Sequence, residues 1–500
     1  MRETSLSSNT AKQHVADVCL ILEGSYPFVQ GGVSSWCHTL MRSLPETTFH
    51  IVSIQPSDAD LKSKYETLPN ITGHTTIVFK GERQLPKALF QGKRPLAELL
   101  RKSFFEASLE DFGDFVALMS TSSHQQPVSD REYWDLTREM YDSLAPATSF
   151  QQFFWVWHSL LNSVAEVLSC PAPPARVYHT ISTGYAGLFG AAARQRTGRP
   201  LLLTEHGIYT NERTVELMAS SALHDSFGNA PYLSDHRRDA RDVWVRAFEC
   251  MGILCYESSD RIISLSQSGQ TAQRGLGAPF EKTQVIANGI DLDRFTSISL
   301  KPPGGRQIIT FIGRVVRIKD VETFIRAMDI VFKSDPNVAA WIVGPDDEEP
   351  DYARQCYKLV SSLGIGERLE FLGMRDVVQI LGQVDMVVLT SLSEGQPLTL
   401  LEAGAAGLPC VASDVGSCRD ILLGGDAPAS GGYVTALMSP QDTATAILKL
   451  LADPADARAK GAALRARVCE SYSLDLMREA YAGLYHKYAN APTCSDRAKV

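Results

Sequence analysis

One stretch in the second half of this 500-residue chain strongly constrains what the chain can fold into. The apolar run Met386–Thr390 has the composition of a strand buried on both faces of a parallel sheet. The turn Ser393–Gln396 follows, and Pro397 then fits the start of a helix, where its missing N–H costs nothing. The sequence therefore predicts a strand, a turn and a helix whose N-terminus faces the edge of a parallel sheet.

This predicted helix start has the chemistry of a phosphate site with carboxylates on both sides. Backbone N–H groups at the start of a helix, here near Leu398 and Thr399, and the helix dipole both favour an anion. Glu394 lies before the helix and Glu402 lies eight residues further on, within the helix. Since carboxylates accept hydrogen bonds from hydroxyls, the pattern fits a nucleotide-sugar. An ordinary strand–helix unit with two solvated glutamates is the other interpretation of these residues taken alone.

A second candidate anion site follows the strand predicted at Ile308–Ile312. Arg314 and Lys319 come next, five positions apart and just before a helix. Arginine offers a planar fork and lysine a point charge, so together they suit an anion, with Arg317 as a further cation of the same loop. The alternative is a set of surface cations. We expect the acidic loop Gly344–Glu349 to be solvated.

The first half of the chain carries two further loops at predicted strand ends. Val15–Glu23 predicts a strand, and the loop after it contains Gly31 and Gly32 before a helix capped by Ser34 or Ser35. The loop is not a GxGxxG fingerprint, and a plain tight turn is the alternative.

A second strand, Pro200–Thr204, delivers His206 to its carboxyl end, where ligands bind in open α/β sheets. A structural role is the alternative for this histidine. Glu212 and Arg213 are expected in the loop beyond, either facing an acceptor or as a solvated charge pair.

The length of the chain predicts more than one domain. The linker Lys301–Gly305 divides an N-terminal domain, residues 1–298, from a C-terminal domain, residues 299–475, and a last helix occupies residues 476–500. Residues of about 82–170 are less regular and predict a helical insertion in the first domain. Four aromatic side chains of this insertion are expected to lie in the core: Phe153, Phe154, Trp155 and Trp157.

Composition excludes several classes of protein. A net charge of −9 and a pI near 5.7 argue against a broad nucleic-acid surface. The N-terminal residues lack the apolar core of a signal peptide, and no apolar run approaches the roughly 20 residues that span a bilayer. The ten cysteines include no CxxC pair, which favours reduced thiols and a cytoplasmic location. We discount Asp291–Asp293 as a metal motif because it follows the turn at Gly289.

The E-x7-E pattern within Ser393–Pro409, together with Gly-Arg-x4-Lys-Asp at Gly313–Asp320, resembles the donor site of family 4 retaining glycosyltransferases. This resemblance implies the GT-B fold: an α/β protein with two Rossmann-like, doubly wound parallel-sheet domains facing each other across a cleft. The second domain would bind a nucleotide-sugar donor, and the last helix would cross back onto the first domain. Transfer would need neither a metal nor a cofactor.

The resemblance also implies a role for each matching residue. The residues implied in catalysis are His206, Arg314, Lys319 and Glu394. The residues implied in donor binding are Gly31, Gly32, Arg314, Lys319, Met374, Arg375, Glu394, Gly395, Leu398, Thr399 and Glu402. In these roles Arg314 and Lys319 hold the diphosphate, Glu394 holds sugar hydroxyls, and Glu402 holds the ribose.

Three stretches narrow the resemblance to the branch of this family that serves bacterial Pel exopolysaccharide synthesis: Glu23–His38, Thr204–Arg213 and Gly344–Cys356. That branch implies a UDP-sugar donor, either UDP-glucose or a UDP-N-acetylhexosamine, and a growing polysaccharide as acceptor. It also implies a cytoplasmic enzyme, peripheral to the inner membrane through a polysaccharide synthase and export complex. Two other functions stay open: a nucleotide-sugar 2-epimerase of the GT-B fold, and a non-catalytic nucleotide-sugar-binding subunit of a synthase complex.

Overall fold

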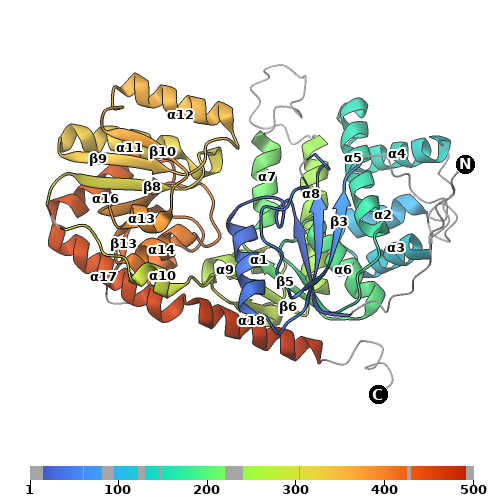
Figure 1. Cartoon of the computed structure of the whole chain (residues 1–500). Helices are drawn as coiled ribbons and strands as arrows, with labels where there is room; N and C mark the ends of the chain where they lie inside the picture. The colour runs from blue at the N-terminus through green and yellow to red at the C-terminus, as the bar shows by residue number, and fades with distance from the viewer. Residues whose placement is uncertain are drawn as a thin grey trace, which may run out of the picture.

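The computed structural model describes residues 15–59, 61–80, 95–121, 130–146, 148–219, 240–302, 304–424 and 429–490. Within these ranges the chain forms two α/β domains that lie side by side, each built on a parallel sheet (Figure 1).

The first domain is built on a seven-stranded sheet with the order β3-β2-β1-β4-β5-β6-β7. Its strands are β1 (Ala16–Glu23), β2 (Phe49–Gln55), β3 (Ile71–Val78), β4 (Ala175–Thr180), β5 (Leu201–Glu205), β6 (Arg261–Ser264) and β7 (Thr283–Val285). All pairings between neighbours are parallel. The chain order reverses between β1 and β4, so the loops after these strands diverge and leave a crevice above the sheet.

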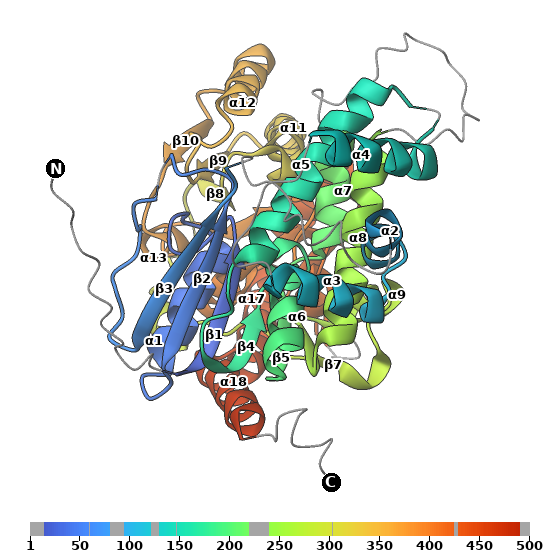
Figure 2. The ribbon, with the colours of Figure 1, turned by 90° about the vertical axis from the view of Figure 1, so that its right-hand side faces the viewer.

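Helices cover both faces of this sheet (Figure 2). They are α1 (Gly32–Ser43), α2 (Leu96–Phe105), α3 (Leu109–Thr121), α4 (Asp130–Leu144), α5 (Phe150–Ser169), α6 (Tyr185–Thr197), α7 (Tyr209–Ala219), α8 (Ala240–Ser258), α9 (Gln267–Gly275) and the short η3 (Phe280–Lys282). One apolar core joins α1 and the last helix of the chain to one face. A larger core joins α2 to α6 and α8 to the other face.

Three local predictions in the first domain need correction. Helix α1 begins at Gly32 with Gly31 as its N-cap, so neither Ser34 nor Ser35 caps it. Glu212 and Arg213 lie on helix α7 and not in a loop.

The third correction concerns the predicted insertion, whose described part forms helices α2 to α5. Phe153 and Trp157 are buried there as expected, but Trp155 is 62% exposed. Helix α5 packs one face on the core, and Trp155 lies on the opposite face. The segments 81–94 and 122–129 of the insertion lie outside the described residues.

The second domain is built on a six-stranded parallel sheet with the order β10-β9-β8-β11-β12-β13. Its strands are β8 (Gln307–Ile312), β9 (Val338–Val343), β10 (Leu369–Gly373), β11 (Met386–Leu389), β12 (Cys410–Ser413) and β13 (Gly432–Thr435). The order reverses between β8 and β11. The loops carrying the two predicted anion-binding motifs are therefore neighbours at this crevice.

Two further apolar cores cover the faces of the second sheet. The helices are α10 (Leu292–Thr296), η4 (Arg317–Lys319), α11 (Val321–Ser334), α12 (Pro350–Leu363), α13 (Val377–Leu381), α14 (Leu398–Ala406), α15 (Cys418–Leu423), α16 (Pro440–Ala452) and α17 (Pro454–Ser471). Asp291 accepts a hydrogen bond from the backbone N–H of Arg294 and so caps α10.

The last helix, α18 (Leu474–Ala489), runs from the second domain along the underside of the first (Figure 1). It forms most of the helix predicted to cross back, whose residues 491–500 lie outside the described part of the chain. At the crossing, Ile290 donates to the carbonyl of Tyr472 at 3.0 Å and accepts from the N–H of Leu474 at 2.9 Å. The two segments that connect the domains therefore lie side by side and form one hinge. The predicted boundary at residue 298 falls between β7 and β8 and stays a prediction.

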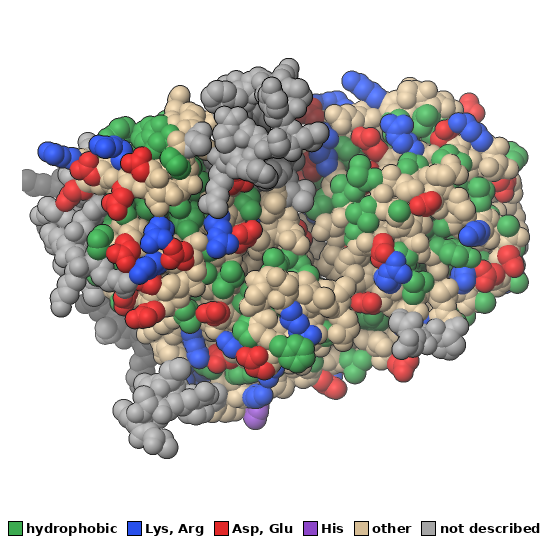
Figure 3. Space-filling view, turned by 180° about the vertical axis from the view of Figure 1, so that it is seen from behind, with side chains coloured by type: hydrophobic (Ala, Val, Ile, Leu, Met, Phe, Trp, Pro, Cys, Tyr) green, Lys and Arg blue, Asp and Glu red, His purple; other side chains and the backbone are tan. Residues whose placement is uncertain are grey.

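Two surface features bear on function. None of the helices in the described ranges has both the length and the apolar composition that crossing a membrane requires. Figure 3 shows positive and negative side chains interspersed over the described part of one face.

Candidate active site

The loops after β8 and β11 meet at the crevice of the second sheet and are tied together by backbone groups. The N–H of Leu392 donates to the carbonyl of Ile318 at 2.8 Å, and the Thr390 hydroxyl donates to the carbonyl of Asp320 at 2.8 Å. Pro397 is the N-cap of α14, one position before the helical start that its ring favours.

Lys319 and Glu394 form an ion pair in this crevice. The Lys319 Nζ lies 2.5 Å from Glu394 Oε1, and the Ser391 hydroxyl donates to the same oxygen at 2.6 Å. The two side chains are 19% and 11% exposed, so the pair is largely shielded from water. A pair of this kind holds both groups in fixed places, and an entering anion has a preset cation to meet.

Arg314 is also paired, to a carboxylate of the acidic loop. Its Nη1 lies 2.5 Å and 2.6 Å from the two oxygens of Glu348, and Arg317 Nε lies 3.7 Å from Glu349 Oε2. Gly344 allows this approach, because a Cβ there would overlap the carbonyl of Gly313. The acidic loop is exposed as expected, with the Glu348 side chain 51% exposed, but it is also paired with Arg314 and Arg317, which was not predicted.

The remaining predicted donor residues of the second domain surround this pair of loops. Burial raises the pKa of Glu402 to about 7, and nearby Arg294 opposes the rise. Met374 is 65% exposed and Arg375 is exposed as well, on the loop after β10. Thr399 is half-buried at the start of α14. Leu398 begins that helix.

On the first domain, His206 directly follows β5. Burial lowers the pKa of its imidazole to about 3, so the ring is neutral near pH 7. Its Nε2 is buried without a hydrogen-bond partner among the described residues. The ring centroid lies 4.4 Å from that of Trp36 in an edge-to-face contact at 69°.

Glu205, the residue before His206, is held by side chains from α8, α9 and the loop before α6. Its carboxylate accepts from the Tyr256 hydroxyl at 2.8 Å, from Gln273 Nε2 at 3.0 Å and from the Thr183 hydroxyl at 3.3 Å. Burial raises its pKa to about 7, and these hydrogen bonds act in the opposite direction. Glu205 therefore fixes the backbone from which His206 projects.

The two domains touch at three points around this site. Gly395 packs on the backbone of His206 so closely that a Cβ would overlap the His206 carbonyl. The Ser268 hydroxyl donates to the carbonyl of Gly416 at 2.8 Å. The N–H of Asn288 donates to Gln396 Oε1 at 2.6 Å. The domains are thus held together by the same turn that carries Glu394.

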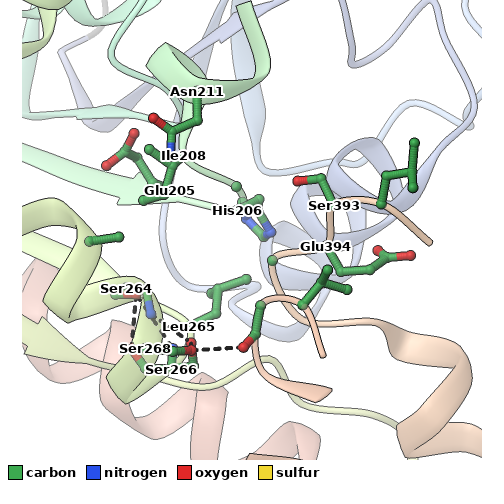
Figure 4. A pocket seen from close by; sticks show the side chains of 17 residues that line it. Glu205, His206, Ile208, Asn211, Ser264, Leu265, Ser266, Ser268, Ser393 and Glu394 are labelled. Atoms are coloured by element: carbon green, nitrogen blue, oxygen red, sulfur yellow. Dashed lines mark hydrogen bonds between the residues drawn. The ribbon is translucent and has the colours of Figure 1, made fainter. Parts of the chain in front are cut away.

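A pocket of about 250 Å³ lies between the domains at these contacts (Figure 4). The first domain contributes the ends of β5 and β6 and the starts of α7 and α9. The second contributes the turn after β11 and the turn after β12. The lining of the pocket includes Glu205, His206, Asn211, Ser266, Glu394 and Gly395.

The structure brings together some of the predicted site residues and leaves others apart. His206, Glu394 and Gly395 line one pocket, and Lys319 joins them through its ion pair. Gly31 and Gly32 lie at the open N-terminus of α1 and are not part of the lining.

Six further predicted residues of the second domain are likewise outside the lining of this pocket: Arg314, Met374, Arg375, Leu398, Thr399 and Glu402. The sequence interpretation missed Asn211 and Ser266. Ser266 lies two residues after the end of β6, so the rule that ligands bind at strand ends would have found it.

Solved structures define the class of protein. The structure of HepE from Anabaena in complex with UDP and glucose superposes with a TM-score of 0.58 and 16% identity, covering 94% of this chain and 99% of that one. Sucrose-phosphate synthase from Thermosynechococcus elongatus superposes with a TM-score of 0.60 and 18% identity, covering 94% and 98%. The chain therefore has the GT-B fold, as predicted.

Sequence comparisons define the family. The chain belongs to the family described as "Domain of unknown function (DUF3492)", whose model matches residues 16–281, and residues 306–453 match "Glycosyl transferases group 1". A D-inositol 3-phosphate glycosyltransferase of Rhodococcus jostii (strain RHA1) is 26% identical over 340 residues, covering 63% of this chain and 69% of that protein. Residues 306–453 are thus a group 1 glycosyltransferase domain within a chain of the GT-B fold.

Proposed function

We propose that the protein is a retaining, metal-independent glycosyltransferase that transfers a sugar from a UDP-sugar to a growing exopolysaccharide. The observation that carries this proposal is the Lys319–Glu394 ion pair, which lies at the crevice of the second sheet and opposite His206 of the first domain. Two lining residues, the carboxylate of Glu394 and the neutral imidazole of His206, thus meet at one interdomain pocket, and Lys319 is paired with that carboxylate. That is the chemistry needed to hold a diphosphate and a hydroxyl-rich sugar together.

In this proposal the second domain binds the nucleotide part of the donor. The diphosphate displaces Glu348 from Arg314 and takes Lys319 as a second cation, helped by the first N–H groups of α14. Glu402 accepts hydrogen bonds from the ribose, and the exposed Met374–Arg375 loop contacts the base. Charge that builds up on the departing diphosphate then meets preset positive groups, which is the largest electrostatic contribution to such a reaction.

The sugar would occupy the interdomain pocket, which has the size of one hexose and not of a whole nucleotide-sugar. Glu394 holds its hydroxyls and His206 contacts it from the other domain. The C1–O bond to the diphosphate breaks, a bond from C1 to the acceptor oxygen forms, and the acceptor proton passes to the departing phosphate oxygen.

Both carboxylates of the pocket are engaged by other side chains, Glu205 by three groups and Glu394 by Lys319. This supports attack by the acceptor from the face that the diphosphate leaves, with retention at C1, over a covalent glycosyl-enzyme. In this proposal, the three contacts between the domains limit the access of water to the reacting sugar.

We further propose UDP-glucose or a UDP-N-acetylhexosamine as the donor, and a cytoplasmic role in Pel polysaccharide synthesis beside an inner-membrane synthase complex. The complex of the structural neighbour HepE with UDP and glucose supports the donor class. The resemblance of Glu23–His38, Thr204–Arg213 and Gly344–Cys356 to the Pel glycosyltransferase PelF supports the role.

The test is glycosyl transfer from a panel of UDP-sugars to oligosaccharide acceptors in the presence of EDTA, with the anomeric configuration of the product read by NMR. We expect an α-linked product from an α-linked donor. Glu394→Ala or Glu394→Gln should lower turnover by about 100-fold or more, while Glu370→Ala, an exposed glutamate on β10, should not.

Near-normal turnover in both Glu394 variants would contradict the proposed site. A changed sugar formed from the donor alone would indicate a 2-epimerase. Donor binding without any turnover would indicate a non-catalytic subunit.

A further inference from the structure

A chain of contacts runs from the hinge between the domains to the ring of His206. It begins at Met477 of α18, whose Sδ accepts a hydrogen bond from the N–H of Gly289 at 3.4 Å. Gly289 belongs to the hinge, and a Cβ there would overlap the backbone of Ser473. The same Sδ accepts the indole N–H of Trp36 at 3.1 Å. A single thioether thus joins the hinge to a tryptophan of the first domain.

The ring of Trp36 in turn packs against the imidazole of His206. Its ring lies edge to face with the imidazole at 4.4 Å and with Tyr481 of α18 at 5.4 Å. Trp36 is 3% exposed, and Nε2 of His206 has no hydrogen-bond partner in the described part of the chain. The imidazole is therefore packed against Trp36 and has no hydrogen bond at Nε2 among the described residues.

The backbone beneath His206 is anchored to the same helix. The Tyr481 hydroxyl lies 3.0 Å from the Thr204 hydroxyl, two residues before His206. The Thr204 hydroxyl also lies 2.9 Å from His179 Nε2, and His179 Nδ1 lies 2.8 Å from the Tyr485 hydroxyl. Burial lowers the pKa of His179 to about 3, so this network is neutral near pH 7. Helix α18 therefore supports both the ring and the strand of His206.

We infer that Trp36 is a positioning residue for His206 and that Met477 ties Trp36 to the hinge. The C-terminal helix α18 thereby sets the position of the imidazole in the pocket. This inference rests on the proposed function, in which His206 contacts the transferred sugar. The consequence is that the hinge between the domains is linked by these contacts to the first-domain side of the site.

The first test measures transfer in a double-mutant cycle. A displacement of about 1 Å in a site can cost about 100-fold in rate, so we expect Trp36→Phe to lower kcat by about tenfold. In a His206→Ala background the same change should cost less than about twofold, because the group through which Trp36 acts is gone. The affinity for UDP, which binds the other domain, should stay within about twofold.

The matched control is Trp157→Phe. Trp157 is 1% exposed in the first-domain core, where its ring packs against Phe105 and Phe153. Equal losses from Trp36→Phe with and without His206, or equal losses from Trp157→Phe, would overturn the inference.

The second test needs no activity and so separates this inference from the proposed function. Met477→Leu keeps the volume of the side chain but cannot accept the indole N–H. NMR of the six tryptophan indoles and of the His206 ring reports the outcome, with resonances assigned from Trp36→Phe and His206→Ala.

We expect Met477→Leu to shift both the Trp36 indole and the His206 imidazole, and Met251→Leu, in the buried core of α8, to shift neither. A shift confined to Trp36 would overturn the coupling between the hinge and His206, even if transfer is active. Shifts of both residues in a protein that shows no transfer would leave the coupling intact and count against the proposed function alone.

Discussion

The two sides of the candidate site are held in place by different forces. On the second domain, Lys319 and Arg314 are charged and sit in ion pairs with Glu394 and Glu348. On the first domain, His206 is neutral and is packed against Trp36. Ion pairs can exchange one partner for a ligand anion, whereas a packed ring stays where its neighbours put it. Under the proposed function, the second domain captures the ligand and the first domain orients the sugar.

The largest expected effect comes from removing the central cation. Lys319→Ala takes away a charge that meets the diphosphate and also leaves Glu394 without its partner, 11% exposed. We expect kcat for transfer to fall by about 1,000-fold while the far-ultraviolet circular dichroism stays unchanged.

Lys333→Ala is the control for this change, because Lys333 pairs with Asp329 on the surface of α11, away from the crevice. Turnover within tenfold of wild type in Lys319→Ala would contradict the role proposed for this cation of the second domain.

The contact between the two sides is tested by Gly395→Ala. The added Cβ would overlap the carbonyl of His206 and force the domains apart at the pocket. We expect about a 100-fold loss of kcat, because the sugar would no longer be held from both domains, with UDP affinity retained.

Gly275→Ala, at the end of α9, is the matched control because its Cβ would meet open space. A loss of UDP affinity equal to the loss of kcat would show that Gly395 serves the nucleotide and not the contact between the domains.

The sequence predicted what depends on neighbours along the chain, and it did not predict what depends on strand order. The run Met386–Thr390 and the turn after it were placed as a strand and a helix start, because apolar runs and Pro397 report local structure. The Lys319–Glu394 pair joins loops 75 residues apart. This pair can be predicted only when the strand order is known, because β8 lies beside β11 although the two strands are not consecutive in the chain.

Two other outcomes have the same physical origin. The acidic loop was expected to be solvated because its own residues have no apolar character, and its pairing with Arg314 depends on β8 lying beside β9. The contact of Trp36 with Met477 joins residues 441 positions apart, so no local pattern indicates it. The position of His206 at a strand end was predicted, but the packing that holds its ring was not.

A smaller effect is expected from the buried carboxylate of the nucleotide side. Burial raises the pKa of Glu402 to about 7, and the ribose hydroxyls bind best to its ionised form. Since the ionised fraction rises through that pH, we expect the affinity for UDP-glucose to increase about tenfold between pH 6 and pH 8.

Calorimetric titrations across this range with wild type and Glu402→Gln measure the effect. The variant should bind more weakly and should lose this pH dependence. An unchanged dependence in the variant would assign the titration to another group, of which Glu205 is the first to examine.

The smallest expected effect tests whether a ligand anion replaces the ion-pair partner of Arg314. Glu348→Gln frees Arg314 from an exposed pair, and such pairs contribute roughly 0–1 kcal/mol. We expect UDP to bind about two- to threefold more tightly, as measured by calorimetry at low salt. Weaker binding in this variant would mean that Glu348 supports the site instead of competing for it.

The most direct test of the division between the two sides is calorimetric binding of UDP, with EDTA present, to wild type, Lys319→Ala and His206→Ala. The account predicts that wild type binds UDP without a metal. It also predicts that Lys319→Ala weakens binding by about tenfold or more and that His206→Ala leaves it within about twofold. Equal weakening in both variants, or no UDP binding by wild type, would contradict the account.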